Sequence, residues 1–298
     1  MGCHQFLLDP RGMAGDMEDM KTLLTLGHGY CAEALAHHLL PLGWQVTGTA
    51  RSVQRADEMR AAGVTPLAYP GDLTAALAAA SHILVSAAPT SEGDVFLEKA
   101  GQAICAARPQ WVGYLSTTAV YGDHQGGWVN EETAPRPLSS RAVARVLAET
   151  QWRATGLPVH IFRLAGIYGP GRGPFAKIRD GSARQIIKKN QVFSRIHVED
   201  IAHVLAASMA APDAGQIYNL CDDNPAPPED VLKYAAALLG LPPPPVLDFE
   251  TADLPEMTRS FYGESKRVCN DKIKEKLGVK LIHPTYQAGL QALLNMGQ

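Results

Sequence analysis

The chain alternates short apolar runs with longer segments in which apolar residues recur at helical spacing. The short runs predict buried strands at residues 23–26, 44–50, 65–69, 82–86, 111–115, 159–164 and 216–220. The longer segments predict helices at residues 30–40, 53–62, 73–79, 95–107, 141–155, 201–209, 229–239 and 286–294. Strands that alternate with helices form βαβ units, so the expected fold class is α/β with a doubly wound parallel sheet.

A glycine-rich turn, G-H-G-Y-C-A at residues 27–32, joins the first predicted strand to the first predicted helix. Gly27 lets the chain turn tightly, Gly29 leaves room for a ligand against the backbone, and Ala32 lets the helix lie close to the strand. Tyr30 and Cys31, the first helical residues, present free N–H groups at the positive end of the helix dipole. This G-x-G-x-x-A pattern indicates a Rossmann-type dinucleotide site, and an ordinary structural turn is the alternative.

The regular alternation ends near Gly169, and the later sequence contains more loops, including a proline-rich connector at residues 241–245. We expect a dinucleotide-binding domain formed by residues 20–171 plus about 196–221. A smaller C-terminal substrate domain, about 172–195 plus 222–298, is expected over the carboxyl ends of the strands. Residues 1–19 have no apolar signal-peptide core and are expected to be a disordered tail.

The end of the second strand indicates which dinucleotide is bound. NAD-binding folds hold the ribose hydroxyls with an acidic residue there, whereas this chain has Arg51, followed by Arg55 one helical turn later. A guanidinium suits a 2′-phosphate, so the expected cofactor is NADP, with NAD as the alternative. Solvated arginines at a helix start are the competing interpretation. Asp72 either contacts the adenine or caps the next helix, and Ala87, after the fourth strand, is a further candidate cofactor contact.

Composition narrows the class of protein. The chain has 298 residues, a formal net charge of −3 and no basic block, which gives no support for nucleic-acid binding. Its five cysteines are far apart, so neither a disulfide framework nor a metal site is predicted, and a reducing cytoplasm is the expected location. No apolar run approaches the roughly 20 residues of a membrane span.

Several segments, taken in order, resemble one enzyme family. They are the glycine turn, L-S-T-T-A-V-Y-G at residues 115–122, R-L-A-G-I-Y-G-P-G at 163–171, I-H-V-E-D-I-A at 196–202 and I-Y-N at 217–219. The chain resembles the extended short-chain dehydrogenase/reductase superfamily, in its nucleotide-sugar epimerase-like branch. The resemblance runs from about Met20 to the C-terminus and implies a small-molecule substrate and, as in many relatives, a homodimer.

The resemblance also implies where catalysis takes place. In that family a Ser or Thr after the fifth strand works with a Tyr-x-x-x-Lys pair on the next helix, and Thr117 matches the hydroxyl position. The Tyr and Lys positions fall on Arg141 and Arg145. Arg145 keeps a positive charge for the nicotinamide ribose, but Arg141 cannot act as a general acid near neutral pH. The chain is therefore expected to be an atypical member that lacks the usual proton donor.

Three other residues are candidates for that proton donor: Tyr121, His124 and Tyr168, each of which also has a structural interpretation. Cations that could bind a diphosphate-sugar substrate are Arg195, Lys188, Lys189, Arg259, Lys266 and Arg267, with solvated surface charge as the alternative. The remaining polar residues have structural interpretations. His197 is expected to be packed, Asp200 to cap a helix, and Asp222-Asp223 to form a solvated turn.

The sequence therefore predicts an NADP(H)-binding oxidoreductase or epimerase-like enzyme that acts on a small polar or sugar-like substrate. Its candidate catalytic positions are Thr117, Tyr121, Arg141 and Arg145. The alternative hypothesis is a non-catalytic NADP(H)-binding module that reports redox state to a partner.

Overall fold

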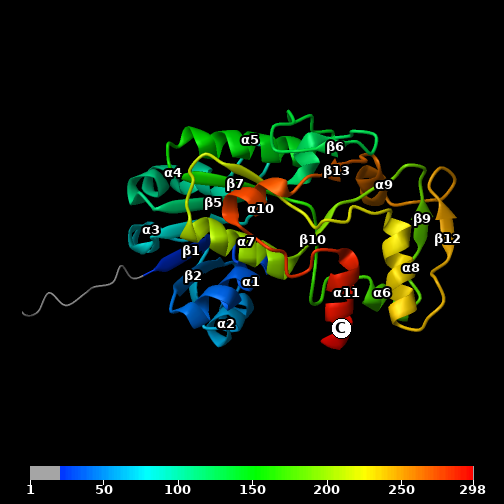
Figure 1. Ribbon diagram of the computed structural model, residues 1–298. Helices are drawn as coiled ribbons and strands as arrows, with labels where there is room; N and C mark the ends of the chain where they lie inside the picture. The colour runs from blue at the N-terminus through cyan, green and yellow to red at the C-terminus, as the bar shows by residue number, and fades with distance from the viewer. Residues whose placement is uncertain (1–20, 298) are drawn as a thin grey trace, which may run out of the picture.

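The computed structural model describes residues 21–297 and contains one large parallel sheet covered by helices on both faces (Figure 1). Its seven strands have the order β11-β7-β5-β4-β1-β2-β3, and every neighbouring pair is parallel. The strands are β1 (Thr22–Leu26), β2 (Gln45–Ala50), β3 (Thr65–Ala68), β4 (His82–Val85), β5 (Trp111–Thr117), β7 (Val159–Leu164) and β11 (Ile217–Leu220). From β1 the chain adds β2 and β3 on one side, and from β4 it adds the remaining strands on the other side. The order of strands therefore reverses between β1 and β4, which is where ligands bind in sheets of this kind.

The two faces of the sheet are covered by different helices. One apolar cluster joins the sheet to α1 (Tyr30–Leu39), α2 (Val53–Ala61) and α7 (Val198–Ala210). A second joins the opposite face to α3 (Thr74–Ala79), α4 (Val95–Ala107) and α5 (Ser140–Ala154). Strands β4, β5 and β7 are buried along nearly their whole length because both faces are covered.

A third apolar cluster lies beyond the carboxyl ends of the strands, at the right of Figure 1. It contains residues of α6 (Phe175–Arg179), α8 (Pro228–Leu238) and α11 (Tyr286–Asn295). Near it lie α9 (Glu256–Tyr262) and the pair β9 (Gln185–Ile187) and β12 (Val246–Asp248). The other short elements are η1 (Leu40–Leu42), η2 (Thr118–Tyr121), β6 (Trp128–Val129), β8 (Gly166–Tyr168), β10 (Arg195–His197), β13 (Arg267–Val268) and α10 (Asp271–Leu277).

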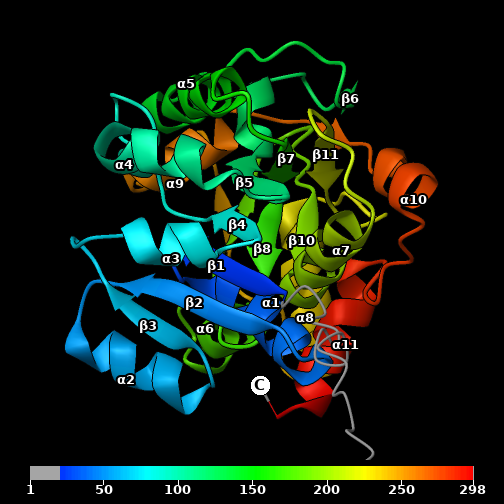
Figure 2. The same cartoon turned by 90° about the vertical axis from the view of Figure 1, so that its left-hand side faces the viewer.

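The predicted fold class is confirmed: each of the seven predicted strands belongs to the parallel sheet, as the turned view in Figure 2 shows. The two-domain division remains a prediction. Val268, Ile273 and Val279, from the stretch assigned to the substrate domain, pack in the first cluster against the main sheet. The expected tail at residues 1–19 lies outside the described residues. Within the described residues no helix has the length and apolar character needed to span a membrane.

Candidate nucleotide-binding and active site

The glycine turn places an uncapped helix start beside open space. Gly27 has a φ of +90°, and a Cβ there would lie 2.8 Å from the backbone nitrogen of Ala87. Gly29 is the extended N-cap residue of α1, has no side chain to cap the helix, and would have no atom within 4 Å of an added Cβ. The first N–H groups of α1 therefore face a cradle that an anion can occupy.

His28, between these glycines, turns its side chain into the protein. Its Nδ1 lies 2.8 Å from the Thr25 hydroxyl, and it packs so closely on Gly48 that a Cβ there would come within 2.8 Å of the imidazole. Burial, followed by the nearby charge of Arg55, lowers the pKa of His28 to about 4. A neutral, inward-facing ring leaves the outer side of the turn as bare backbone.

Arg55 is attached to the same turn. Its Nη2 donates to the His28 carbonyl at 3.2 Å and to Glu33 at 3.1 Å, and its Nη1 donates to Glu58 at 3.0 Å. Arg51 is exposed, and within residues 21–297 no hydrogen bond or ion pair holds its guanidinium. The two arginines therefore differ: Arg55 supports the turn, whereas Arg51 is available to a ligand.

Asp72 bonds the first residue of α3, whose N-cap residue is Leu73. Its Oδ1 accepts hydrogen bonds from the Thr74 backbone nitrogen at 2.9 Å and hydroxyl at 2.6 Å, which lower the pKa of Asp72. These bonds stabilise the start of α3, the carboxylate is still exposed, and a contact of Asp72 with the adenine stays a prediction.

The loop after β8 reaches across to the glycine turn. The Tyr30 hydroxyl donates to the Pro170 carbonyl at 2.9 Å, and the guanidinium of Arg172 lies 4.9 Å from the centre of the Tyr30 ring. Arg172 thus stands near the start of α1, although it follows Pro170, which is 140 residues from Tyr30 in the sequence. Sequence reasoning missed it because glycines and prolines surround it and no local pattern marks it.

A cavity of about 810 Å³ lies over the carboxyl ends of β5 and β7. Its lining includes Thr117, Arg141 and Arg145 from the predicted catalytic set, together with Arg172. The turn that begins at Ala87 continues into its wall through Ala88 and Pro89. The structure therefore brings three of the four predicted catalytic residues together, next to the glycine turn.

Arg145 is fixed from one side only. Its Nη1 donates to three oxygens, the Ala87 carbonyl at 3.2 Å, the Tyr114 hydroxyl at 3.1 Å and the Leu115 carbonyl at 2.7 Å. Within the described part of the chain, its Nε and Nη2 make no hydrogen bond. Arg141, one turn earlier on α5, is exposed with its guanidinium 5.5 Å from the centre of the Phe261 ring.

Thr117 is half-buried at the end of β5, and its Oγ1 accepts a hydrogen bond from the Ala119 backbone nitrogen at 3.2 Å. The acceptor side of this hydroxyl is engaged, so its O–H can donate to a ligand in the cavity. Helix α5, with the sequence SRAVARVLAETQWRA, contains neither Tyr nor Lys.

The other candidate proton donors lie elsewhere or are buried. Tyr121, expected as a catalytic candidate, has no exposed surface, donates its hydroxyl to Asn219 at 2.7 Å, and does not line the cavity. The Nε2 of His124 lies 3.2 Å from the Tyr121 carbonyl oxygen, to which it donates when it holds the ring proton, and His124 is not in the cavity lining. Tyr168 does line the cavity, but its hydroxyl is buried and burial raises its pKa, so it is a poor acid.

Only two of the six cations proposed for a diphosphate-sugar substrate, Arg195 and Lys266, line this cavity. Arg195 donates to the carbonyls of Phe193 and Ala226 at 2.9 and 3.2 Å. Lys266 is paired with Glu264 at 2.6 Å. The remaining four, which are Lys188, Lys189, Arg259 and Arg267, are absent from its lining.

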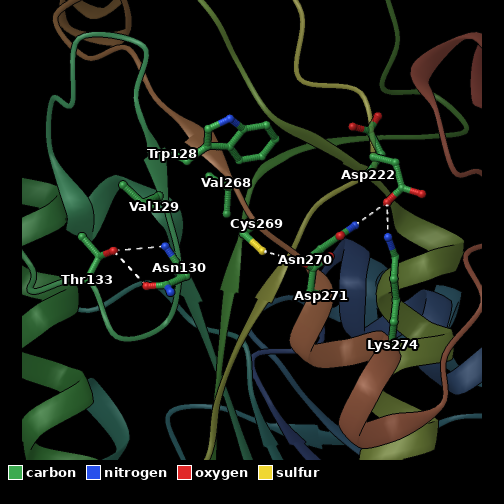
Figure 3. A pocket seen from close by; sticks show the side chains of 11 residues that line it. Trp128, Val129, Asn130, Thr133, Asp222, Val268, Cys269, Asn270, Asp271 and Lys274 are labelled. Carbon is green, nitrogen blue, oxygen red and sulfur yellow. Dashed lines mark hydrogen bonds and ion pairs between the residues drawn. The ribbon is translucent and has the colours of Figure 1, made fainter.

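A second cavity, of about 700 Å³, lies between β6 and α10 (Figure 3). The prediction that Asp222-Asp223 forms a solvated turn is wrong for Asp222. Asp222 is 1% exposed, and burial raises its pKa to about 7. Its neighbour Asp223 accepts hydrogen bonds from Asn270 and Lys274, both at 2.7 Å.

His197 is packed, as expected. It is 1% exposed, its ring centre lies 4.0 Å from that of His283, and His283 in turn contacts Glu199 at 2.9 Å. These three side chains could place ligand atoms within 4.8 Å of one another. His283 already bonds the Glu199 carboxylate, and the Nδ1 of His197 accepts from the Glu199 backbone nitrogen at 3.3 Å. Asp200 does not cap α7 as expected. Instead it accepts from the backbone nitrogens of Ile282 and His283, tying the C-terminal segment to α7.

The sheet order and the uncapped glycine turn define a Rossmann-type α/β protein. Residues 23–221 match the NAD dependent epimerase/dehydratase family, and the chain belongs to that family. Protein YeeZ of Escherichia coli (strain K12) is 32% identical over 271 residues, covering 85% of this chain and 94% of that protein.

Two further relatives extend the comparison. A solved structure of a functionally unknown conserved protein from Silicibacter pomeroyi DSS is 55% identical, with a TM-score of 0.89, and covers 93% of this chain and 99% of that one. A 3-diazoavenalumate denitrifying reductase from a Streptomyces species is 27% identical over 220 residues, covering 67% of this chain and 69% of that protein.

Proposed function

We propose that this protein is an NADP(H)-dependent oxidoreductase that acts on a small polar substrate in the 810 Å³ cavity. The observation that carries the proposal is the open cradle above Gly29, at the uncapped start of α1. A diphosphate fits there, because the site offers free N–H groups and no side chain. The family is NAD dependent, and one relative is named as a reductase.

The residues proposed to hold the cofactor surround the cradle. Backbone groups of Gly27, Gly29, Tyr30, Cys31 and Ala32 would receive the diphosphate, and Ala87 would border it. The guanidinium of Arg172, beside the ring of Tyr30, adds a positive charge at the same place. Arg55 would keep the turn in shape through the His28 carbonyl, with Asp72 at the adenine end.

Arg51 is the residue proposed to select NADP over NAD. Its exposed guanidinium, without an ion-pair partner in the described chain, is suited to a 2′-phosphate. Isothermal titration of NADPH and NADH tests this. We expect the parent protein to bind NADPH more tightly and Arg51→Asp to remove that preference. Tighter binding of NADH by the parent protein would contradict NADP selectivity.

Bound at this site, the nicotinamide ring supplies a two-electron redox couple. The chain's own contribution is positional. Thr117 would donate its hydroxyl hydrogen to an oxygen of the substrate, and Arg145, anchored through Nη1, would offer Nε and Nη2 to the nicotinamide ribose. Since α5 has no tyrosine, the proton required for reduction at oxygen would come from solvent in the cavity.

A non-catalytic redox-sensing module is the second candidate, and the absence of Tyr and Lys from α5 favours it. The two are separated by a screen of carbonyl compounds and nucleotide sugars that follows NADPH absorbance and product formation. Turnover that is lost in Thr117→Val supports the enzyme. Binding of NADPH without turnover, combined with partner binding that differs between NADP and NADPH, supports the sensor.

A further inference from the structure

The charges that line the main cavity are strongly one-sided. Five lining residues are cationic, namely Arg141, Arg145, Arg172, Arg195 and Lys266, and Glu264 is the one acidic residue in the lining. Glu264 is neutralised by Lys266, with 2.6 Å between the charged groups. A cavity of this kind attracts an anion, since its low-dielectric walls concentrate the positive potential.

The five cations do not have equal freedom to bind that anion. Arg145 and Arg172 border the cradle assigned above to the cofactor. Arg195 is held by two backbone carbonyls, and Lys266 by Glu264 and the Gly122 carbonyl. Arg141 and Arg172 are both exposed, and within residues 21–297 neither guanidinium has a hydrogen bond or ion pair. Arg172 lies on the Tyr30 ring at the cradle, whereas Arg141 lies on the Phe261 ring and is the one left for a substrate anion.

The cavity lining also has apolar side chains. They include Leu164, Ile167, Val192, Phe193 and Phe261. A ligand that satisfies both the cationic and the apolar side chains has an apolar body and an oxyanion at one end. A guanidinium recognises both carboxylate and phosphate oxygens through paired hydrogen bonds.

We propose that Arg141 is a specificity-determining residue that binds the carboxylate or phosphate group of the substrate, a small organic anion with an apolar body. The proposal rests on the proposed function, because it places this anion beside the bound cofactor. Arg141 occupies the first turn of α5, and its guanidinium lies 5.5 Å from the centre of the Phe261 ring in the cavity lining.

The test is calorimetric titration of the NADPH-loaded full-length protein with trans-cinnamate, phenyl phosphate and the uncharged trans-cinnamamide. One oxyanion is expected to bind at least about tenfold more tightly than the amide, the equivalent of one charge-assisted hydrogen-bond pair. Arg141→Gln should bring the two affinities within about threefold, while Arg141→Lys keeps part of the preference. The tighter of the two anions identifies the group that is recognised.

Arg153→Gln is the matched control, because Arg153 is an exposed arginine on the same helix and outside the cavity lining. It should behave as the parent protein. Equal affinity for acid and amide, no detectable binding of either anion, or an unchanged preference in Arg141→Gln would overturn the anion site. NADPH titration of the same samples separates the two ideas: a parent protein that does not bind NADPH refutes the proposed function itself.

Discussion

Alanine at each of the two glycines of the turn should separate binding from folding. At Gly29 the backbone has φ −106° and ψ −166°, which any residue can adopt, and an added Cβ would meet nothing within 4 Å. Gly29→Ala should therefore change the free energy of unfolding by less than about 1 kcal/mol, the scale of an N-cap change. The same methyl group would occupy the cradle, so NADPH affinity should fall at least about 100-fold, corresponding to two lost charge-assisted hydrogen bonds.

Gly27→Ala should instead lower the free energy of unfolding. Its φ of +90° is unfavourable for alanine, and the Cβ would lie 2.8 Å from the Ala87 backbone nitrogen. The strained conformation costs about 1–3 kcal/mol, and forced overpacking a similar amount. Urea denaturation measures the free energy of unfolding, and calorimetric titration measures NADPH affinity. If Gly29→Ala binds NADPH as the parent does, or unfolds as readily as Gly27→Ala, the cradle is not the binding site.

Further expectations concern stability. Glu149→Gln removes the buried partner of Arg163, whose Nη2 lies 2.8 Å from Glu149, and should lower the free energy of unfolding by about 3–5 kcal/mol in urea titrations; a change under about 1 kcal/mol would contradict a buried ion pair. Gly48→Ala would place a Cβ 2.6 Å from the Thr25 hydroxyl, so the midpoint of thermal unfolding should fall by several degrees. An unchanged midpoint would show that Thr25 and His28 can move to accommodate the methyl group. Burial lowers the pKa of His28, His82 and His197 to about 4. Between pH 6.5 and 4 the unfolded chain therefore binds more protons than the folded chain, so the free energy of unfolding should fall by at most about 3 kcal/mol per histidine as the pH is lowered through that window. Burial raises the pKa of Asp222 to about 7, so this residue stabilises the folded chain as the pH falls from 7 toward the ordinary pKa of Asp and opposes the effect of the histidines. The Asp222→Asn variant removes this opposition, and flat stability from pH 6.5 to 4 in that variant would contradict the lowered histidine pKa values.

The main sheet was predictable because each of its strands is a self-contained apolar run bounded by turns or helices. The paired strands of two or three residues, such as β8 with β10 and β6 with β13, were not predictable. Such short pairs have no periodicity of their own and depend on segments brought together by the rest of the fold.

The cofactor cradle was predictable for a similar reason, since the glycines, the strand and the helix are contiguous. The cavity wall was not. Arg172 lies on a loop and contacts Tyr30, and Phe261 lies on the late helix α9 and contacts Arg141. Only the folded chain shows these contacts. Tyr121 shows the reverse error: its position soon after β5 suggested a site residue, but the following 3-10 turn directs its ring into the core.

The anchoring of Arg145 has a consequence for the thermodynamics of binding. A free arginine side chain loses about 2 kcal/mol of rotamer entropy when a ligand immobilises it. In this protein the three oxygens around Nη1 immobilise the side chain during folding. A ligand that hydrogen-bonds the remaining nitrogens meets a rigid donor, so its association should carry a smaller entropic penalty than it would with a flexible lysine at that position.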